Sequence, residues 1–507
     1  MEIDVKSASL NTAAGAVCLV AYFEDEGIKG KGPIASLNRV LGGQIKMLTS
    51  SEKFSGKFLE TLLMRTGGKI GFDRLVLLGL GKRVDVTEDR LRQSVGKGAT
   101  LVQTMGLSEI TLHCDAKMLG KAGVEILAQS LVEGLLLSLY RFDRLKTDQK
   151  NSTKITRCTV LVEDAKALAA TEYGAVRGKV IAEGVCYTRD LCTMPSNMAT
   201  PTYLANEATQ IAESSGMSIE VFERDEIESM GMGAYAAVAQ GTDEPPKFIV
   251  LQYHGAAKGR KKKPIVLVGK AVTFDTGGIS LKPGANMEQM KYDMAGGATV
   301  LGVMKAVAAL KLPLDIVAIL PATDNMPSGK AIHPGDVVTS LSGKTIEIIN
   351  TDAEGRLCLA DALTYGTRFK PAAMINLATL TGACVVALGQ HAMGMMGNNP
   401  ALLKKVQAAG EAVSERTWEL PLWDTYQNQI ESPVADLQNV GGRGAGTITA
   451  GLFLKAFVGD VPWVHLDIAG TSWYNDGRHP YVPKGASGVG VRLLVHYLTT
   501  LTDRKPR

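Results

Sequence analysis

The hydrophobic pattern of the first third of the chain alternates short apolar runs with longer stretches of helical periodicity. Short apolar runs predict strands, whereas apolar residues that recur every three or four positions predict helices. Because strands that alternate with helices form parallel or mixed sheets, the pattern predicts a smaller N-terminal α/β domain. Strands are expected at 17–23, 75–80, 109–113 and 159–162, and helices at 88–105 and 121–140.

A long helical pattern at 165–190 follows a polar stretch and predicts a connecting helix, to which we assign residues 166–195. The first domain is therefore expected over 1–165, where no polar residues show ligand spacing, and we assign it to assembly or regulation. Thr200 and Pro201 then cap and begin another helix.

Further apolar runs continue the α/β alternation to the end of the chain. They predict a larger C-terminal α/β catalytic domain over 196–507, with a mixed central sheet. Strands are expected at 218–222, 248–253, 265–268 and 314–320, and a helix at 298–310.

The composition is that of an ordinary soluble protein, with 45% hydrophobic and 21% charged residues. The net charge of +4 is too small at this length to argue for a polyanionic partner. Seven scattered cysteines without a Cys-x-x-Cys pair suggest neither a disulfide framework nor a thiolate metal site. These features fit a cytoplasmic protein.

Two segments raise alternatives to that description. Residues 371–390 are uncharged and nearly long enough to span a bilayer, but Asn376, Thr379 and Thr381 favour a buried strand followed by a loop. We therefore expect no membrane segment. The basic run 258–263 is expected to be a solvated loop, because no aromatic residues are interleaved to stack on bases.

The strand at 265–268 runs into a segment that contains Lys270, Asp275 and Lys282. In open α/β sheets, ligands bind beyond the carboxyl ends of the strands, which is where these charges fall. A lysine directly after a buried strand is costly unless its charge is paired or lost. Lys270 therefore either pairs with Asp275 or, as a neutral amine, coordinates a metal.

Two further segments place acidic residues ahead of apolar helical patterns. Asp293 precedes one such pattern, and Asp352 and Glu354 lie in the octapeptide 350–357 before another. Acidic residues near a helix N-terminus also suit the helix dipole, so a purely structural role stays open for the octapeptide. With Asp275, these carboxylates would repel one another unless dications lay between them. We infer two metals about 3.5 Å apart, of the Mg, Mn or zinc type.

The octapeptide 350–357 and the segment 268–283 closely resemble the leucyl (cytosol) aminopeptidase family. The resemblance extends to 378–383 and 462–473, and is loose in the first domain. It implies a hexameric hydrolase that releases N-terminal amino acids, leucine and others, from peptides. In that mechanism, a water that bridges two metals attacks the scissile carbonyl.

The resemblance also implies individual roles. Lys282 would stabilise the developing oxyanion, and Arg356 would hold a bicarbonate ion that acts as general base. Two divalent ions, Mn or Zn, would bind to five side chains: Lys270, Asp275, Asp293, Asp352 and Glu354. Four residues match positions that bind the substrate: Met290, Thr379, Leu380 and Gly382.

Ala271 and Gly297 depart from the family's usual pattern, but neither replaces a ligand. A DNA-binding regulatory role is the alternative hypothesis, because some relatives of the family bind DNA. It would call for a basic stripe on the first domain, where the charges look mixed. A catalytically silent assembly protein would be expected to have lost a ligand or Lys282, and all of these are present.

Overall fold

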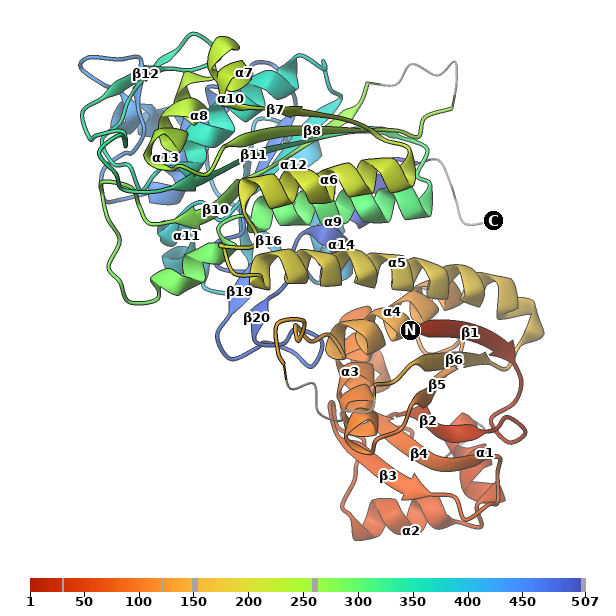
Figure 1. Ribbon diagram of the computed structural model, residues 1–507. Coiled ribbons are helices and arrows are strands. Elements are labelled where there is room, and N and C mark those ends of the chain that lie inside the picture. Colours follow the sequence, from red (N-terminus) through yellow and green to blue (C-terminus); the bar gives the residue numbers. More distant parts are fainter. Residues whose placement is uncertain (30–31, 120–122, 148–153, 258–262, 503–507) are drawn as a thin grey trace. The chain divides into compact units, whose positions relative to one another are not determined.

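The computed structural model describes residues 1–29, 32–119, 123–147, 154–257 and 263–502 (Figure 1). The basic run predicted as a solvated loop therefore lies outside the described residues, apart from Lys263. The chain forms two compact units. The first comprises 1–183 with 476–483, and the second comprises 184–475 with the described part of 484–507.

The first unit is built on a six-stranded sheet of the described residues, in the order β1-β6-β5-β2-β4-β3. All pairings are parallel except that of β3 with β4. The strands are β1 (Glu2–Ser7), β2 (Gly15–Tyr22), β3 (Thr61–Arg65), β4 (Phe72–Gly79), β5 (Glu109–Cys114) and β6 (Arg157–Val162).

The two faces of this sheet contribute to two different hydrophobic clusters, which also contain residues of the helices. Val17 and Leu19 of β2 belong to one hydrophobic cluster, and Cys18 and Val20 belong to another. Successive side chains of a strand point to opposite faces, so a run that is apolar at every position is buried on both. The helical elements are α1 (Pro33–Val40), α2 (Gln44–Ser51), η1 (Arg83–Asp85), α3 (Glu88–Thr104) and α4 (Gly123–Ser138).

The predicted long helix is observed as α5 (Leu168–Thr193), after a short 3-10 turn, η3 (Ala165–Ala167). The predicted helix that begins at Thr200 is α6 (Pro201–Ser215). Thr200 Oγ1 accepts a hydrogen bond from the backbone N–H of Tyr203, as expected of an N-cap. The α/β class and the mixed sheet predicted for the second part of the chain are confirmed.

The second unit contains a nine-stranded mixed sheet among the described residues, in the order β16-β15-β18-β14-β9-β11-β8-β7, with β10 paired to β11. Its central strands β18, β14, β9 and β11 are parallel, whereas β7, β8 and β15 run antiparallel to a neighbour. The strands are β7 (Ser218–Phe222), β8 (Lys247–His254), β9 (Ile265–Gly269), β10 (Ala271–Asp275), β11 (Asp315–Asn325), β14 (Ala373–Ala378), β15 (Met393–Gly397), β16 (Thr417–Glu419) and β18 (Trp463–Asp467).

Smaller sheets and helices complete this unit (Figure 1). The small sheets comprise β12 (Val337–Thr339), β13 (Thr345–Glu347) and β17 (Leu437–Gln438), and β19 (Trp473–Tyr474) with β20 (Gly485–Ala486). The helices are α7 (Arg224–Ser229), α8 (Gly233–Val238), α9 (Ala295–Leu310), α10 (Gly355–Thr367), α11 (Gly382–Leu388), α12 (Pro400–Val413), α13 (Gly446–Lys455) and α14 (Val491–Thr500), with 3-10 turns η4 (Ala239–Gly241), η5 (Met287–Tyr292) and η6 (Asp424–Ile430).

Two sequence predictions were wrong in detail. The strand expected to close at Pro321 continues to Asn325. Its parallel pairing with β9 ends at Ile319, and its parallel pairing with β10 begins at Ala322. Pro321 lies between these two pairings, so no hydrogen bond to a parallel strand is lost because proline has no N–H. In the segment 371–390, the expected loop is largely the helix α11. Thr381 caps this helix by accepting a hydrogen bond from the N–H of Cys384.

One segment of the described residues, Met287–Leu310, is long and apolar enough to cross a membrane by length and composition. Its most apolar window is 78% buried inside the protein, where α9 packs in the core. Burial within the fold accounts for its composition, since a core helix is apolar on most of its surface.

Candidate metal centre and active site

Lys270 follows β9 directly and lies in the centre of an acidic cluster. Its Nζ is 2.6 Å from Asp293 Oδ2 and 2.7 Å from Glu354 Oε1, and it donates to the carbonyl oxygen of Thr379 at 3.1 Å. A Cβ on Gly355 would lie 2.5 Å from the Lys270 side chain, so glycine at this position allows the close approach. The lysine is 3% exposed, and its charge is paired as a buried charge requires.

Asp275 ends β10, and its carboxylate is held from both sides. Oδ1 accepts hydrogen bonds from the backbone N–H of Gly277 and from Asn325 Nδ2, each at 2.8 Å. Oδ2 is 2.7 Å from Lys282 Nζ. Lys282 also forms an ion pair with Asp352, so this lysine joins two of the three acidic segments that the sequence singled out.

Asp293 and Glu354 complete the cluster. Thr379 Oγ1 donates to Asp293 Oδ1 at 2.6 Å, which fixes the orientation of this carboxylate. Glu354 lies at the N-cap position of α10 and is 2% exposed. One oxygen atom from each of Asp275, Asp293 and Glu354 lies within 4.8 Å of the others.

The charges in this cluster shift one another's pKa. Burial raises the pKa of Glu354 and of Asp293, and repulsion from Asp275 adds to it, against the attraction of Lys270. Burial would lower the pKa of Lys270, but the surrounding carboxylates outweigh it and raise the pKa. Carboxylates outnumber ammonium groups here, which contributes to all three increases, so the cluster favours additional positive charge.

The donor set fits divalent cations. Asp293 Oδ2 and Glu354 Oε1 are fully buried and, apart from the Lys270 ion pair, have no hydrogen-bond partner. Buried carboxylate oxygens are normally well satisfied, and a divalent cation would give these two atoms a further partner. Oxygen ligands with one amine and no thiolate suit Mn or Zn in a carboxylate-rich site.

Two asparagines that the sequence did not single out hold the acidic segments together. Asn325 Nδ2 donates to Asp275 Oδ1 and to the carbonyl oxygen of Thr351. Asn439 Nδ2 donates to the carbonyl oxygen of Asn350, and its Oδ1 accepts from the N–H of Ile349. Neither asparagine has a local sequence signal, because each acts on segments that are distant along the chain.

Arg356 is buried on α10. Its Nη1 donates to the carbonyl oxygen of Asn439 at 2.8 Å, while its Nε has no hydrogen-bond partner. Burial lowers the pKa of Arg356 to about 10, against the attraction of Glu354 and Asp467. A buried guanidinium with a free donor can bind an anion.

The four predicted substrate residues come from two segments. Met290 is in η5 and partly buried, Thr379 and Leu380 follow β14, and Gly382 begins α11. Thr379 contacts the acidic cluster directly through Asp293, and a side chain at Gly382 would enter open space.

Asp467, at the end of β18, positions the segment that contains three of these residues. It accepts hydrogen bonds from the N–H of Leu380 at 3.2 Å and from Thr381 Oγ1 at 2.7 Å. It is fully buried, and no spacing pattern in the sequence distinguishes it from other acidic residues.

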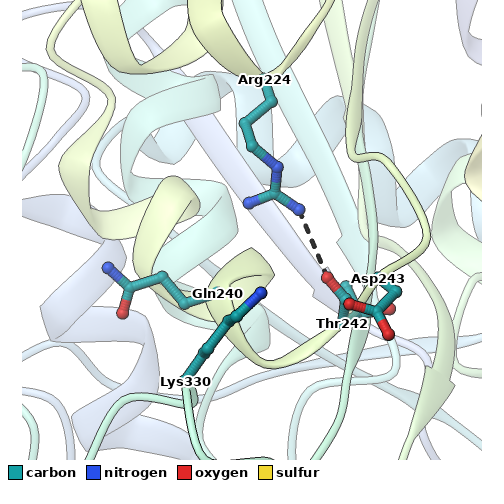
Figure 2. A pocket seen from close by; sticks show the side chains of 5 residues that line it. All are labelled: Arg224, Gln240, Thr242, Asp243 and Lys330. Carbon is teal, nitrogen blue, oxygen red and sulfur yellow. Dashed lines mark hydrogen bonds between the residues drawn. The ribbon is translucent and has the colours of Figure 1, made fainter.

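A polar pocket of about 470 Å³ on the same unit lies outside the acidic cluster. Figure 2 shows Arg224 and Lys330 on opposite sides of it, and Arg224 Nη2 donates to the carbonyl oxygen of Thr242 at 3.4 Å. Among the described residues that line this pocket, none is a predicted site residue.

The catalytic-domain profile of the cytosol aminopeptidase family matches residues 186–495, and the N-terminal-domain profile of the same family matches 19–149. The chain belongs to the cytosol aminopeptidase family. It is therefore an aminopeptidase and a hydrolase, of a metal-dependent family.

Individual members of the family are similar over nearly the whole chain. The cytosol aminopeptidase of Pseudomonas aeruginosa is 44% identical over 98% of this chain and 99% of its own, and a probable cytosol aminopeptidase of Geobacter sp. is 46% identical over the same shares. A solved mutant of tomato leucine aminopeptidase has a TM-score of 0.86 at 32% identity, covering 99% of this chain and 96% of its own. The bottromycin maturation enzyme BotP in complex with Mn has a TM-score of 0.83 at 30% identity, covering 96% and 100%.

A histidine beside this site gives this family member an acid-sensitive core. His465 on β18 is fully buried, and its Nδ1 is 2.8 Å from Asn376 Nδ2. Burial, with a smaller contribution from Arg356, lowers the pKa of His465 to about 3. Because this value lies below that of an unfolded histidine, the unfolded state takes up the proton first, and stability is lost as the pH falls from about 6.5 towards 3.

We expect His465→Gln to lose less stability on acidification than the parent. Between pH 7 and 4.5, the difference in the free energy of unfolding should be about 3 kcal/mol, as measured by denaturant titration. His333→Gln is the control, because that side chain is 66% exposed and should behave as the parent does. Equal losses in the His465 variant and the parent would contradict this assignment.

Proposed function

We propose that this aminopeptidase is a metal-dependent exopeptidase that releases N-terminal amino acids, leucine among them, from peptides. The observation that supports this most strongly is the set of three buried carboxylates, Asp275, Asp293 and Glu354, with oxygens within 4.8 Å of one another. The free amino group of a peptide N-terminus would be a ligand for one of the bound cations. An internal peptide bond offers no such amine, so the site would favour chain ends.

The cations would be held by the residues that the sequence proposed, and Mn or Zn suits them. Four carboxylates and one lysine amine would surround two dications, which brings the local charge close to neutrality. When bound, such cations act as Lewis acids and lower the pKa of a coordinated water. The ligands would be Lys270, Asp275, Asp293, Asp352 and Glu354.

Lys282 would stabilise the negative charge that develops on the scissile carbonyl oxygen. Its Nζ lies beside Asp275 and Asp352, and its side chain is 21% exposed, so it can face a substrate as well as the cluster. The neighbouring carboxylates raise the pKa of Lys282 despite the opposing effect of burial, which keeps the ammonium charged at neutral pH. A fixed ammonium beside the reacting carbonyl is an oxyanion donor.

Arg356 would hold a bicarbonate ion through its guanidinium. Its Nε is a buried donor without a partner, and the hydrogen bond from Nη1 to the Asn439 carbonyl keeps the group in place. A bound bicarbonate would supply general-base capacity.

The side chain of the N-terminal residue would lie against Met290, Thr379 and Gly382, and the backbone of Leu380 would hold the substrate. Thr379 links this surface to the cluster through its hydrogen bond to Asp293, and Asp467 fixes the backbone of Leu380. A methionine adapts its shape to its neighbour, which suits leucine and other apolar side chains.

The proposal also assigns a role to each part of the chain. Residues 1–165 would serve assembly or regulation, 166–195 would connect, and 196–507 would carry the chemistry, in a cytoplasmic homohexamer. The separate family profiles for 19–149 and 186–495 support such a division.

The test is hydrolysis of a leucyl anilide by the purified protein before and after chelator treatment. We expect activity to fall by about 10³-fold or more with chelator and to return with Mn or Zn, because the cations supply the Lewis acid. An N-acetylated leucyl anilide should not be cleaved, since it lacks the free amino group that would bind a cation. Full activity in the chelated protein, with metal content measured as zero, would overturn the proposal.

A further inference from the structure

A second pocket, of about 470 Å³, lies at the opposite end of the central sheet from the acidic cluster. Its lining includes Ile265 and Ala373, which are the first residues of β9 and β14. Lys270 and Thr379 follow the last residues of the same strands. A strand of five or six residues is about 17–20 Å long, so the pocket and the acidic cluster are distinct sites.

The floor of this pocket is apolar. Ile265, Leu314 and Leu402 line it, and each is at most 7% exposed. A volume of this size is within the range of about 300–1,000 Å³ that small-molecule sites occupy. An aliphatic group of a small molecule would therefore be well covered here.

One side of the pocket is suited to a carboxylate. It contains the N-terminus of α12, where Asn399 accepts from the N–H of Leu402 and Pro400 has no N–H to donate. Ala401 also lines the pocket, and its N–H has no hydrogen-bond partner among the described residues. Lys405, one turn further along α12, adds a positive charge to the helix dipole.

Tyr497 supplies an independent sign that a ligand belongs in the pocket. This residue lines the pocket from α14 and is only 2% exposed, yet its hydroxyl has no hydrogen-bond partner among the described residues. The hydroxyl is also not fully enclosed by protein atoms, so it can be reached from the pocket. A buried hydroxyl normally finds a partner, and a ligand oxygen would provide one.

Asp315 provides the opposite charge. Its Oδ1 accepts from the N–H of Ala256 at 3.1 Å, while its Oδ2 has no partner among the described residues. An ammonium group is the natural ligand for that oxygen. The pocket thus combines an apolar floor, donors for a carboxylate and an acceptor for an ammonium.

We propose that this pocket binds a free amino acid with an apolar side chain, held through its carboxylate by the α12 N-terminus, Lys405 and Tyr497 and through its ammonium by Asp315. A free amino acid is the kind of product that the proposed peptidase reaction releases. The inference rests on the proposed function only in identifying the ligand as a product. The site would let the protein sense the accumulation of its own product.

The test is calorimetric titration of L-leucine into the full-length protein carrying Glu354→Gln, in which weakened metal binding reduces competing binding of leucine at the acidic cluster. Tyr497→Phe and Asp315→Asn should each weaken leucine binding about tenfold, the loss expected for one hydrogen bond or ion pair. Lys405→Met should weaken it similarly, whereas Lys404→Met, on the neighbouring exposed lysine, should leave it within twofold. 4-Methylpentanoate lacks the ammonium group of leucine, and 3-methylbutylamine lacks its carboxylate. Each should bind more weakly than leucine, because both charged groups contribute to binding.

Equal leucine affinity in the parent, Tyr497→Phe and Asp315→Asn would overturn the inference. Binding of 3-methylbutylamine as tight as that of leucine would also overturn it, because the groups proposed to hold the carboxylate would then contribute nothing to the affinity. The proposed function is tested apart from this, in protein with Glu354 intact. Hydrolysis without binding at this pocket removes the inference alone, and binding without hydrolysis removes the proposed function alone.

Discussion

Replacement of Glu354 by glutamine is expected to reduce hydrolysis of a leucyl anilide by about 10³-fold or more, because it removes a ligand charge from the centre of the cluster. Glutamine keeps the shape of the side chain and replaces an anionic oxygen that is 2.7 Å from Lys270 Nζ. The stoichiometry of bound Mn should fall in parallel, as measured by elemental analysis after gel filtration.

The same variant should not be unfolded. In the metal-free protein, the Glu354 carboxylate is repelled by Asp275 and Asp293, so a neutral side chain relieves part of that repulsion. We therefore expect the metal-free variant to melt at no lower a temperature than the metal-free parent. Glu288→Gln, at an exposed glutamate on η5, is the matched control and should keep both metal and activity. A Glu354 variant that retains its metal and more than a tenth of the activity would contradict the assignment.

Replacement of Lys282 by methionine should lower kcat about 10²–10³-fold while KM changes little, the loss typical of one oxyanion donor. Methionine keeps the length of the side chain but removes the ammonium that lies 2.7 Å from Asp275. A purely structural lysine would instead reduce stability or raise KM, so steady-state kinetics separate the two roles.

Lys330→Met provides the comparison, because Lys330 is an exposed lysine of the same unit that lies outside the acidic cluster. It should retain parental kcat and KM. A Lys282→Met enzyme with kcat within threefold of the parent would show that the oxyanion is stabilised by other groups.

Much of the fold follows from local pattern. The run that became β2 is apolar throughout and β4 is apolar over 75–79, which is typical of strands buried on both faces. The helices α3, α5 and α6 have helical periodicity over long windows, and α3 and α6 begin at threonine caps. By contrast, β1 and β3 were not predicted. They are short and mostly exposed on one face, so their pairing partners rather than their own residues define them.

The sequence allowed the residues of the candidate site to be predicted, but not how they are arranged in space. The sequence singled out Lys270, Asp275, Lys282, Asp293 and Glu354 because these charges lie in segments that follow a predicted strand or precede a helical pattern. It could not indicate Asn325, Asn439 or Asp467, since an asparagine or aspartate that bonds to distant backbone leaves no periodic or spacing signal.

The sequence by itself determined the α/β class, most of the longer strands and helices in their order along the chain, and the residues available for metal binding. Only the tertiary structure decided that the acidic segments at 275, 293 and 354 meet within 4.8 Å, that Lys270 is paired with two of them, and that β11 continues through Pro321. The reason is physical. Periodicity and capping are local properties of a few residues, whereas the sheet that brings the strand ends together depends on pairing between strands that lie far apart in the chain.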